Sequence, residues 1–351
     1  MFHTVRNIAK YGTVAGRSAA DAVRERLPPG WSVELRAGSN GQELLTLRAS
    51  DGRHAKLEVV SRKRSTPQDI ALLMQRADGR DRLLLVAPFL SPRARELLAE
   101  ANASYVDRTG NLRVVAHNPA IFLEVRGADR NPDRQPRALR SLKGAAAGRV
   151  VRALCDFMPP YGVRTLATAS TTPLGTVSRV VSLLEEEALV TRDDKKLVTS
   201  VDWPRLIKRW AGDYNVTGSN TMTSYLEPRG LSALAPKLDK LDRYAVTGSL
   251  ASRDIAPPRL AMIYVDDAKR AAQTLDLVPT ETGANVWLLE PFDDVVFERV
   301  QTISMGSVSV IAAALSQVAA DLMTSPGRGP QEAEALIEKA KGSEHAWRKR
   351  P

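Results

Sequence analysis

Residues 170–187 have the sequence STTPLGTVSRVVSLLEEE, and they predict an amphipathic helix. The apolar residues of this stretch recur at intervals of three and four: Val177, Val180, Val181 and Leu184. This spacing places them along one side of a helix, where they can enter a core. Thr172-Pro173 suits the helix start, because the threonine hydroxyl can accept a hydrogen bond from an unpaired N–H and proline has no N–H to lose.

The opposite side of this helix carries small, uncharged or cationic side chains. They are Gly175, Ser178, Arg179 and Ser182. The first carboxylates of the stretch are those of residues 185–187, at the far end of the helix. Such a side can enter the major groove of DNA, where serine and arginine donate hydrogen bonds to base edges and nothing repels phosphate.

The surrounding sequence, from Lys143 to Asp202, predicts two more helices and a hairpin. A helix over 144–157 ends before Pro159-Pro160, and a short second helix follows Gly162. After the third helix, residues 189–198 have the character of strand, polar turn and strand, with cations at the turn. This order is that of a winged helix-turn-helix, in which the hairpin contacts the DNA backbone.

The predicted DNA contacts divide between bases and phosphates. Residues of the third helix would contact bases, cations of the hairpin would hold phosphate, and two residues of the second helix would add to the surface. The full set is Arg164, Thr165, Thr172, Thr176, Ser178, Arg179, Ser182, Arg192, Lys195 and Lys196. The alternative is a small helical domain whose third helix only packs a core. That alternative explains the apolar side but not the carboxylate-free side or the cationic hairpin.

The segment resembles the winged-helix domains of bacterial transcriptional regulators. The matching residues are Thr165-Leu166-Ala167 and Thr176-Val177-Ser178-Arg179-Val180, and the resemblance covers about sixty residues. It implies a DNA-binding domain within a larger regulator.

Composition agrees with a polyanionic partner. The chain has 351 residues and a formal net charge of +10, so nucleic acid is a plausible ligand. Its single cysteine, Cys155, excludes an internal disulfide and is expected to be a small core residue. Apolar runs are too short for a membrane span or a signal region, so we expect a soluble, cytoplasmic protein that associates with the nucleoid and has no membrane partner.

Residues 1–126 alternate strands with helices, which predicts an α/β domain. Helices are expected over 1–26, 67–76 and 91–101, and strands over 31–35, 43–47, 56–60, 82–87, 103–106 and 112–116. The domain resembles the restriction-endonuclease-like fold, whose active members place an acid, one spacer and a lysine on a strand to hold Mg²⁺ and steady the attacking water. Here Glu58 is followed by Val59 and Val60. We therefore expect no metal site, no catalytic residue and no nuclease activity.

Residues 127–143 form a basic, proline-marked linker that could lie along phosphates or remain solvated. After it and the winged helix, residues 205–341 predict a third α/β domain. A strand ending at Gly248-Ser249 resembles the first motif of nucleotidyltransferase folds, whose active members carry Asp-x-Asp on the next strand. That strand here lacks acids until Asp266 and Asp267, at its end, so we expect an inactive domain without a cofactor. The basic tail, 342–351, is expected to be disordered.

The third region also resembles the AbiEi family, the antitoxins of type IV abortive-infection systems. The segments that carry this likeness are 248–249, 289–293, 316–323 and 327–336. Members of that family pair a winged helix with a C-terminal domain and repress their own operon. In this chain the winged helix is central instead of N-terminal, and a nuclease-like domain precedes it.

These observations predict a multidomain α/β protein with a central winged helix-turn-helix over 144–204. We expect a sequence-specific regulator that binds double-stranded DNA as a homodimer and represses its own operon, as an antitoxin-type autorepressor. We do not expect an enzyme. Two alternatives remain open at this point. One is a metal-dependent nuclease targeted by its winged helix, and the other is an antitoxin that neutralises a partner toxin by protein contact.

Overall fold

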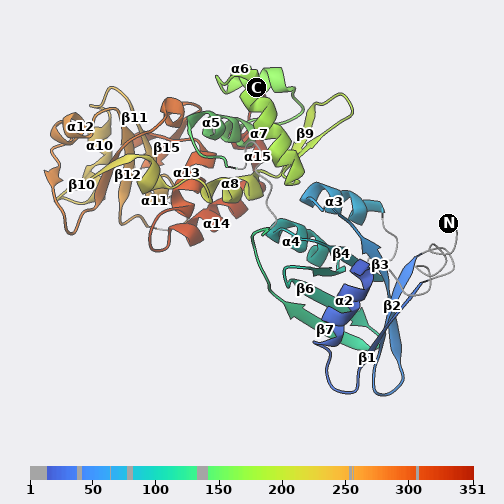
Figure 1. Cartoon of the computed structure of the whole chain (residues 1–351). Helices are drawn as coiled ribbons and strands as arrows, with labels where there is room; N and C mark the ends of the chain where they lie inside the picture. Colours follow the sequence, from blue (N-terminus) through green and yellow to red (C-terminus); the bar gives the residue numbers. More distant parts are fainter. Residues whose placement is uncertain are drawn as a thin grey trace. The chain divides into compact units, whose positions relative to one another are not determined.

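The structure is a computed structural model. It describes residues 14–37, 42–63, 65–76, 82–132, 141–252, 255, 257–305 and 308–351. The chain divides into two compact units, Met1–Arg137 with Glu186–Ala188, and Ala138–Glu185 with Leu189–Pro351. Each unit contains a seven-stranded mixed sheet, and a separate two-stranded hairpin completes a mixed α/β architecture (Figure 1). The coarse prediction of an α/β protein is therefore confirmed.

The first unit is a sheet with helices on both faces. Across the sheet its strands are β1 (Ser32–Ala37), β2 (Glu43–Arg48), β3 (His54–Ser61), β4 (Leu83–Ala87), β5 (Ser104–Asp107), β6 (Leu112–His117) and β7 (Ala120–Val125). The helices are α2 (Val14–Arg24), α3 (Pro67–Arg76) and α4 (Pro92–Glu100). The sequence predicts all of these elements except β7, although the part of its first helix before residue 14 lies outside the described residues.

Strand β4 explains why both faces are covered. It pairs in parallel with β3 and with β5, and all five of its residues are buried. Because side chains alternate along a strand, Leu84 and Val86 enter the core under α2, whereas Leu83 and Leu85 enter the core under α3 and α4. A strand buried on both faces has a continuous apolar sequence, as this one does.

The second unit begins with three helices and the hairpin. They are α5 (Ala145–Asp156), α6 (Val163–Ala169), α7 (Leu174–Glu186), β8 (Val190–Arg192) and β9 (Val198–Val201). All five elements occur where the sequence predicts them. We call residues 141–202 the helix-hairpin segment.

A second sheet follows the helix-hairpin segment. Across it the strands are β13 (Val278–Pro279), β10 (Thr221–Leu226), β14 (Val286–Glu290), β12 (Ala261–Val265), β11 (Tyr244–Thr247), β16 (Val308–Ala312) and β15 (Gln301–Met305). The helices are α8 (Trp203–Ala211), α9 (Val216–Ser219), α10 (Ala235–Leu238), α11 (Gly248–Ala251), α12 (Ala268–Thr274), α13 (Leu315–Met323), α14 (Gly329–Lys341) and α15 (Glu344–Trp347), with 3₁₀ turns η2 (Leu231–Ala233) and η3 (Asp294–Phe297). Strand pairs β12–β14 and β11–β16 are parallel.

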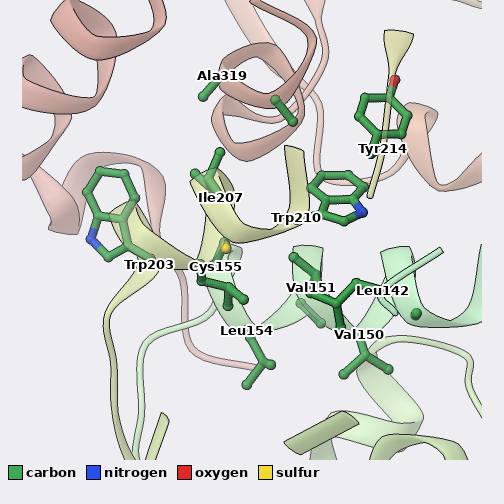
Figure 2. Close-up of a cluster of buried hydrophobic side chains, with 14 of the residues drawn as sticks. Leu142, Val150, Val151, Leu154, Cys155, Trp203, Ile207, Trp210, Tyr214 and Ala319 are labelled. Atoms are coloured by element: carbon green, nitrogen blue, oxygen red, sulfur yellow. The ribbon is translucent and has the colours of Figure 1, made fainter. Parts of the chain in front are cut away.

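One hydrophobic core joins the helix-hairpin segment to this sheet. Helix α8 packs between α5 and α13, and Figure 2 shows Ile207 directed toward Ala319 while Trp210 lies beside Val151. The fully buried Arg152 of α5 donates to the carbonyl oxygens of Val295 (2.5 Å) and Glu298 (3.0 Å). Residues on both sides of position 204 thus contribute to one core.

The expectation that residues 342–351 are disordered is wrong. Residues 344–347 form α15, whose Trp347 packs edge-to-face against Trp203 of α8 with ring centroids 4.8 Å apart. The Trp203 indole donates to Glu344 (2.8 Å). Arg348 is only 6% exposed and donates to the carbonyls of Cys155 (2.9 Å) and Phe157 (2.8 Å), at the C-terminal end of α5. The guanidinium therefore caps a helix end that would otherwise be unpaired.

Cys155 should not react with thiol reagents in the folded protein. Its side chain is fully buried in the shared core, and burial raises the pKa of the thiol far above its usual value. Because the thiolate is the nucleophile, its population near neutral pH becomes negligible. We expect no colour with Ellman's reagent under native conditions and one equivalent in denaturant. Rapid native labelling would contradict this packing.

Candidate nucleic-acid interface

Helix α7 has one side in the core and the opposite side in solvent. Val177, Val180, Val181 and Leu184 are all fully buried. Gly175, Ser178 and Arg179 are exposed on the other side, and Thr176 is half-buried. The two residues on which the prediction of base contacts mainly depends, Ser178 and Arg179, are therefore accessible on a helix that its own core holds in place.

Arg179 lies along the N-terminal half of its own helix. Its Nε donates to the carbonyl of Gly175 (3.1 Å), and its Nη2 donates to the hydroxyl of Thr176 (3.2 Å). In the part of the chain that the structure describes, no carboxylate forms an ion pair with Arg179. Its charge is thus not neutralised by the neighbouring side chains, and its weak local hydrogen bonds can be exchanged for stronger ones to a ligand.

Thr172 belongs to the turn and not to the exposed side. It is only 6% exposed, and its hydroxyl donates to the carbonyl of Ser170 (2.9 Å). Helix α7 begins at Leu174, so the expected cap by the Thr172 hydroxyl is replaced by backbone bonds from Thr176 and Val177 to the carbonyl of Pro173. The assignment of Thr172 as a DNA contact is corrected accordingly: it supports the α6–α7 turn.

Arg192 is also not positioned as expected. Its guanidinium forms a close ion pair with Glu185 at the end of α7, and the two side chains are 13% and 17% exposed. Nη2 also lies 3.5 Å from the hydroxyl of Ser182. The pair joins β8 to α7, so the charge of Arg192 is already neutralised and Ser182 is partly covered. Sequence spacing could not show this, because Glu185 and Arg192 meet only after the chain turns from helix to strand.

The hairpin turn exposes the two lysines. Asp193 closes the turn, because its carboxylate accepts from the backbone N–H of Leu197 (2.8 Å) and its carbonyl accepts from Lys196 N–H (2.9 Å). Lys195 and Lys196 both point into solvent. Tyr161 adds a backbone bridge to Val198 of β9, which ties the hairpin to the segment before α6. The two lysines therefore lie on a hairpin that is held by the Asp193 turn and by the bridge to Tyr161.

Seven of the ten predicted contacts remain on the accessible surface of the helix-hairpin segment. They are Arg164, Thr165, Thr176, Ser178, Arg179, Lys195 and Lys196. Arg164 and Thr165 lie on α6, the helix that precedes α7 in the chain. The surface also contains the exposed Asp194, while Glu186 lies at the opposite end of α7 from Gly175.

The residues compared above with enzyme motifs have partners within the chain or lie apart from one another. Glu58 on β3 accepts a hydrogen bond from Gln42 (3.0 Å), and no group of three metal-ligating His, Cys, Asp or Glu side chains occurs among the described residues. In the second sheet, β11 and β12 are antiparallel with Tyr244 opposite Val265. Asp266 consequently lies at the other end of the strand pair from Gly248. Ser249 donates to Glu332 (2.5 Å), so its hydroxyl is engaged within the chain.

A cavity of about 380 Å³ lies where the start of α5 meets the end of α8. Leu142, Trp210, Asp213, Asn215 and Phe292 contribute to its lining. Burial would raise the pKa of Asp213, but its carboxylate accepts from Leu142 N–H and from Arg209 (both 2.8 Å), and these bonds hold the pKa below its usual value. Asn215 caps α9. Because these polar groups are paired within the chain, the cavity does not indicate a ligand class.

No protein-family model, curated protein or solved structure matches this chain. Among the described residues, none of the helices has the length and apolar character needed to cross a membrane.

Proposed function

We propose that the helix-hairpin segment is a winged helix-turn-helix that binds double-stranded DNA in a sequence-specific manner. The observation that carries the proposal is the exposed side of α7, where Ser178 and Arg179 are accessible and the nearest acids of the helix lie at its far end. A B-DNA major groove is about 12 Å wide and admits one helix of this kind. Arg179 can donate two parallel bonds to guanine, and Ser178 can donate to either base of a pair.

The rest of the segment supports the same geometry. The exposed lysines of the hairpin can bind phosphates. Contacts to phosphates fix the position of a DNA-binding helix along the duplex, and so determine which bases it contacts. Hydrogen bonds from Arg152 to the carbonyl of Val295, and from Arg348 to the end of α5, connect this helix to other parts of the second unit. A binding surface whose supporting helix is fixed by such contacts loses less conformational freedom on association, which favours binding.

We further propose that the flanking regions do not catalyse reactions. A restriction-endonuclease-like first unit and a nucleotidyltransferase-like second sheet would both lack the acids that hold metal, as the surroundings of Glu58 and the position of Asp266 suggest. On this view the chain acts as a regulator in the nucleoid, similar to the AbiEi antitoxins. A homodimer and a cognate toxin are the partners that this role implies.

Selection of bound duplexes from a random pool by the purified full-length chain tests the proposal. Specific regulators bind their sites about 10³–10⁷-fold more tightly than random DNA. We expect a shared motif and a preference in that range by fluorescence anisotropy at fixed salt. Equal affinity for selected and random duplexes would contradict the proposal. Cleavage of the duplex in Mg²⁺ that Glu58→Ala abolishes would instead support the nuclease alternative.

Replacing Lys195 and Lys196 with alanine should weaken binding to every sequence equally. For each phosphate that the variant no longer neutralises, the slope of log affinity against log salt should flatten by about 0.9. The measurement is a salt titration of both selected and random duplexes. Lys269→Ala is the control, because it removes an exposed positive charge on α12, outside the helix-hairpin segment, and the slope should change little. Weaker binding confined to the selected duplex would show that the lysines read bases.

A further inference from the structure

Leu174 is a large apolar side chain left in solvent at the start of α7. It is 46% exposed, whereas the apolar residues three and ten positions further along, Val177 and Leu184, are fully buried. Single exposed leucines are common on protein surfaces, so exposure alone decides nothing. The position of this one is informative, because the first turn of a recognition helix is the part that contacts base edges.

Leu174 lies on the same line of the helix surface as Ser178, one of the predicted base contacts. Residues four apart lie one above the other on a helix, so Leu174 is directly followed by Ser178 along the same line. Around this line the neighbouring side chains are small or polar: Gly175 has no side chain, and Ser178 has only a hydroxymethyl group. Positions 175 and 178 therefore carry no bulky side chain that covers Leu174, and 46% of the leucine is exposed.

We infer that Leu174 contacts the C5-methyl group of a thymine in the major groove. This inference rests on the proposed function. Thymine is the one base that presents an apolar group in that groove, and contact of an apolar side chain with it is a known mode of direct readout. Four residues of helix advance about 6 Å along the axis, and stacked base pairs are about 3.4 Å apart. The thymine thus lies within about two base pairs of the position that Ser178 and Arg179 contact.

The experiment replaces each thymine of the selected duplex, in turn, with deoxyuridine. This change removes the methyl group and leaves every hydrogen-bonding group of the base in place. Burial of one methylene-sized group is worth about 0.8 kcal/mol, which corresponds to roughly a fourfold change in affinity. For the wild-type chain we expect about that decrease at one thymine near the guanine read by Arg179, and no change elsewhere.

The variant Leu174→Ala completes the test. It should bind the thymine duplex about fourfold or more weakly than wild type and should no longer distinguish thymine from deoxyuridine at that position. Leu197→Ala, at the hairpin turn and 37% exposed, is the control and should keep the wild-type response. Circular dichroism and thermal unfolding establish that both variants are folded.

Three outcomes would overturn the inference while leaving the proposed function intact. They are a selected motif without thymine in that region, a wild-type chain insensitive to deoxyuridine at every position, and a Leu174→Ala variant as sensitive as wild type. Failure to select any motif would overturn the proposed function itself, and the thymine contact with it. The two failures are therefore distinguishable.

Discussion

Replacing Arg348 with alanine should lower the free energy of unfolding of the second unit by roughly 2–4 kcal/mol. The guanidinium is 6% exposed and donates to the carbonyl oxygens of Cys155 and Phe157, with a longer bond to that of Leu154. It also bonds to Glu344. Burial would raise the pKa of Glu344, but the bonds from Trp203 and Arg348 outweigh burial and lower the pKa. Truncation would leave buried carbonyl groups without donors.

Chemical denaturation followed by tryptophan fluorescence measures this effect, because Trp203 and Trp210 lie in the same core. Arg350→Ala is the matched control: it removes the same charge two residues later from an exposed side chain, and its stability should stay within about 0.5 kcal/mol of wild type. Equal midpoints for Arg348→Ala and Arg350→Ala would mean that the C-terminal residues do not support α5.

Replacing Arg179 with alanine should remove about 1–3 kcal/mol of discrimination at one base pair, a decrease of about fivefold to 150-fold in specific affinity. The reason is geometric: a guanidinium can donate two bonds to guanine O6 and N7, and the structure leaves this one unneutralised on the exposed side of α7. Binding to random DNA should weaken far less, because that binding depends mainly on phosphate contacts.

The measurement is the ratio of affinities for the selected duplex and a scrambled duplex at one salt concentration. Lys269→Ala serves as the control, since it removes one positive charge from the exposed surface of α12, outside the helix-hairpin segment. It should leave the ratio unchanged. If Arg179→Ala weakened binding to specific and scrambled DNA equally, the base-reading assignment would be wrong.

The sequence predicts the helix-hairpin segment well because its information is local. The apolar residues of α7 repeat with the helical period and face one core, so Val177 and Val180 are buried as expected. Strand β4 is likewise evident from a continuous apolar run between polar stretches. In both cases the pattern within about a dozen residues determines which side chains are buried.

Elements that depend on distant partners are less evident. Strand β10 has the sequence TMTSYL, which lacks a clear strand pattern, and its pairing with β14 and β13 makes it a strand. The C-terminal residues appear as a charged end in the sequence, whereas the structure buries Arg348 against α5, some 190 residues earlier in the chain. Local composition contains no information about such a docking site.

The candidate site shows the same limit. The sequence places Arg192 and Lys195 together as hairpin cations, but their surroundings differ because Glu185 lies close to Arg192 alone. Thr172 is a residue type that often caps helices, but its side chain is buried in the turn between α6 and α7. Which polar side chains remain available to a ligand is decided by tertiary contacts and not by residue type.

Protection of guanine N7 from dimethyl sulfate is the most direct test of the claim that the exposed side of α7 reads bases. On the selected duplex, the wild-type chain should protect at least one guanine in the major groove, and Arg179→Ala should lose that protection while the remainder of the footprint persists. A footprint without any protected guanine, or one that Arg179→Ala leaves unchanged, would contradict the claim.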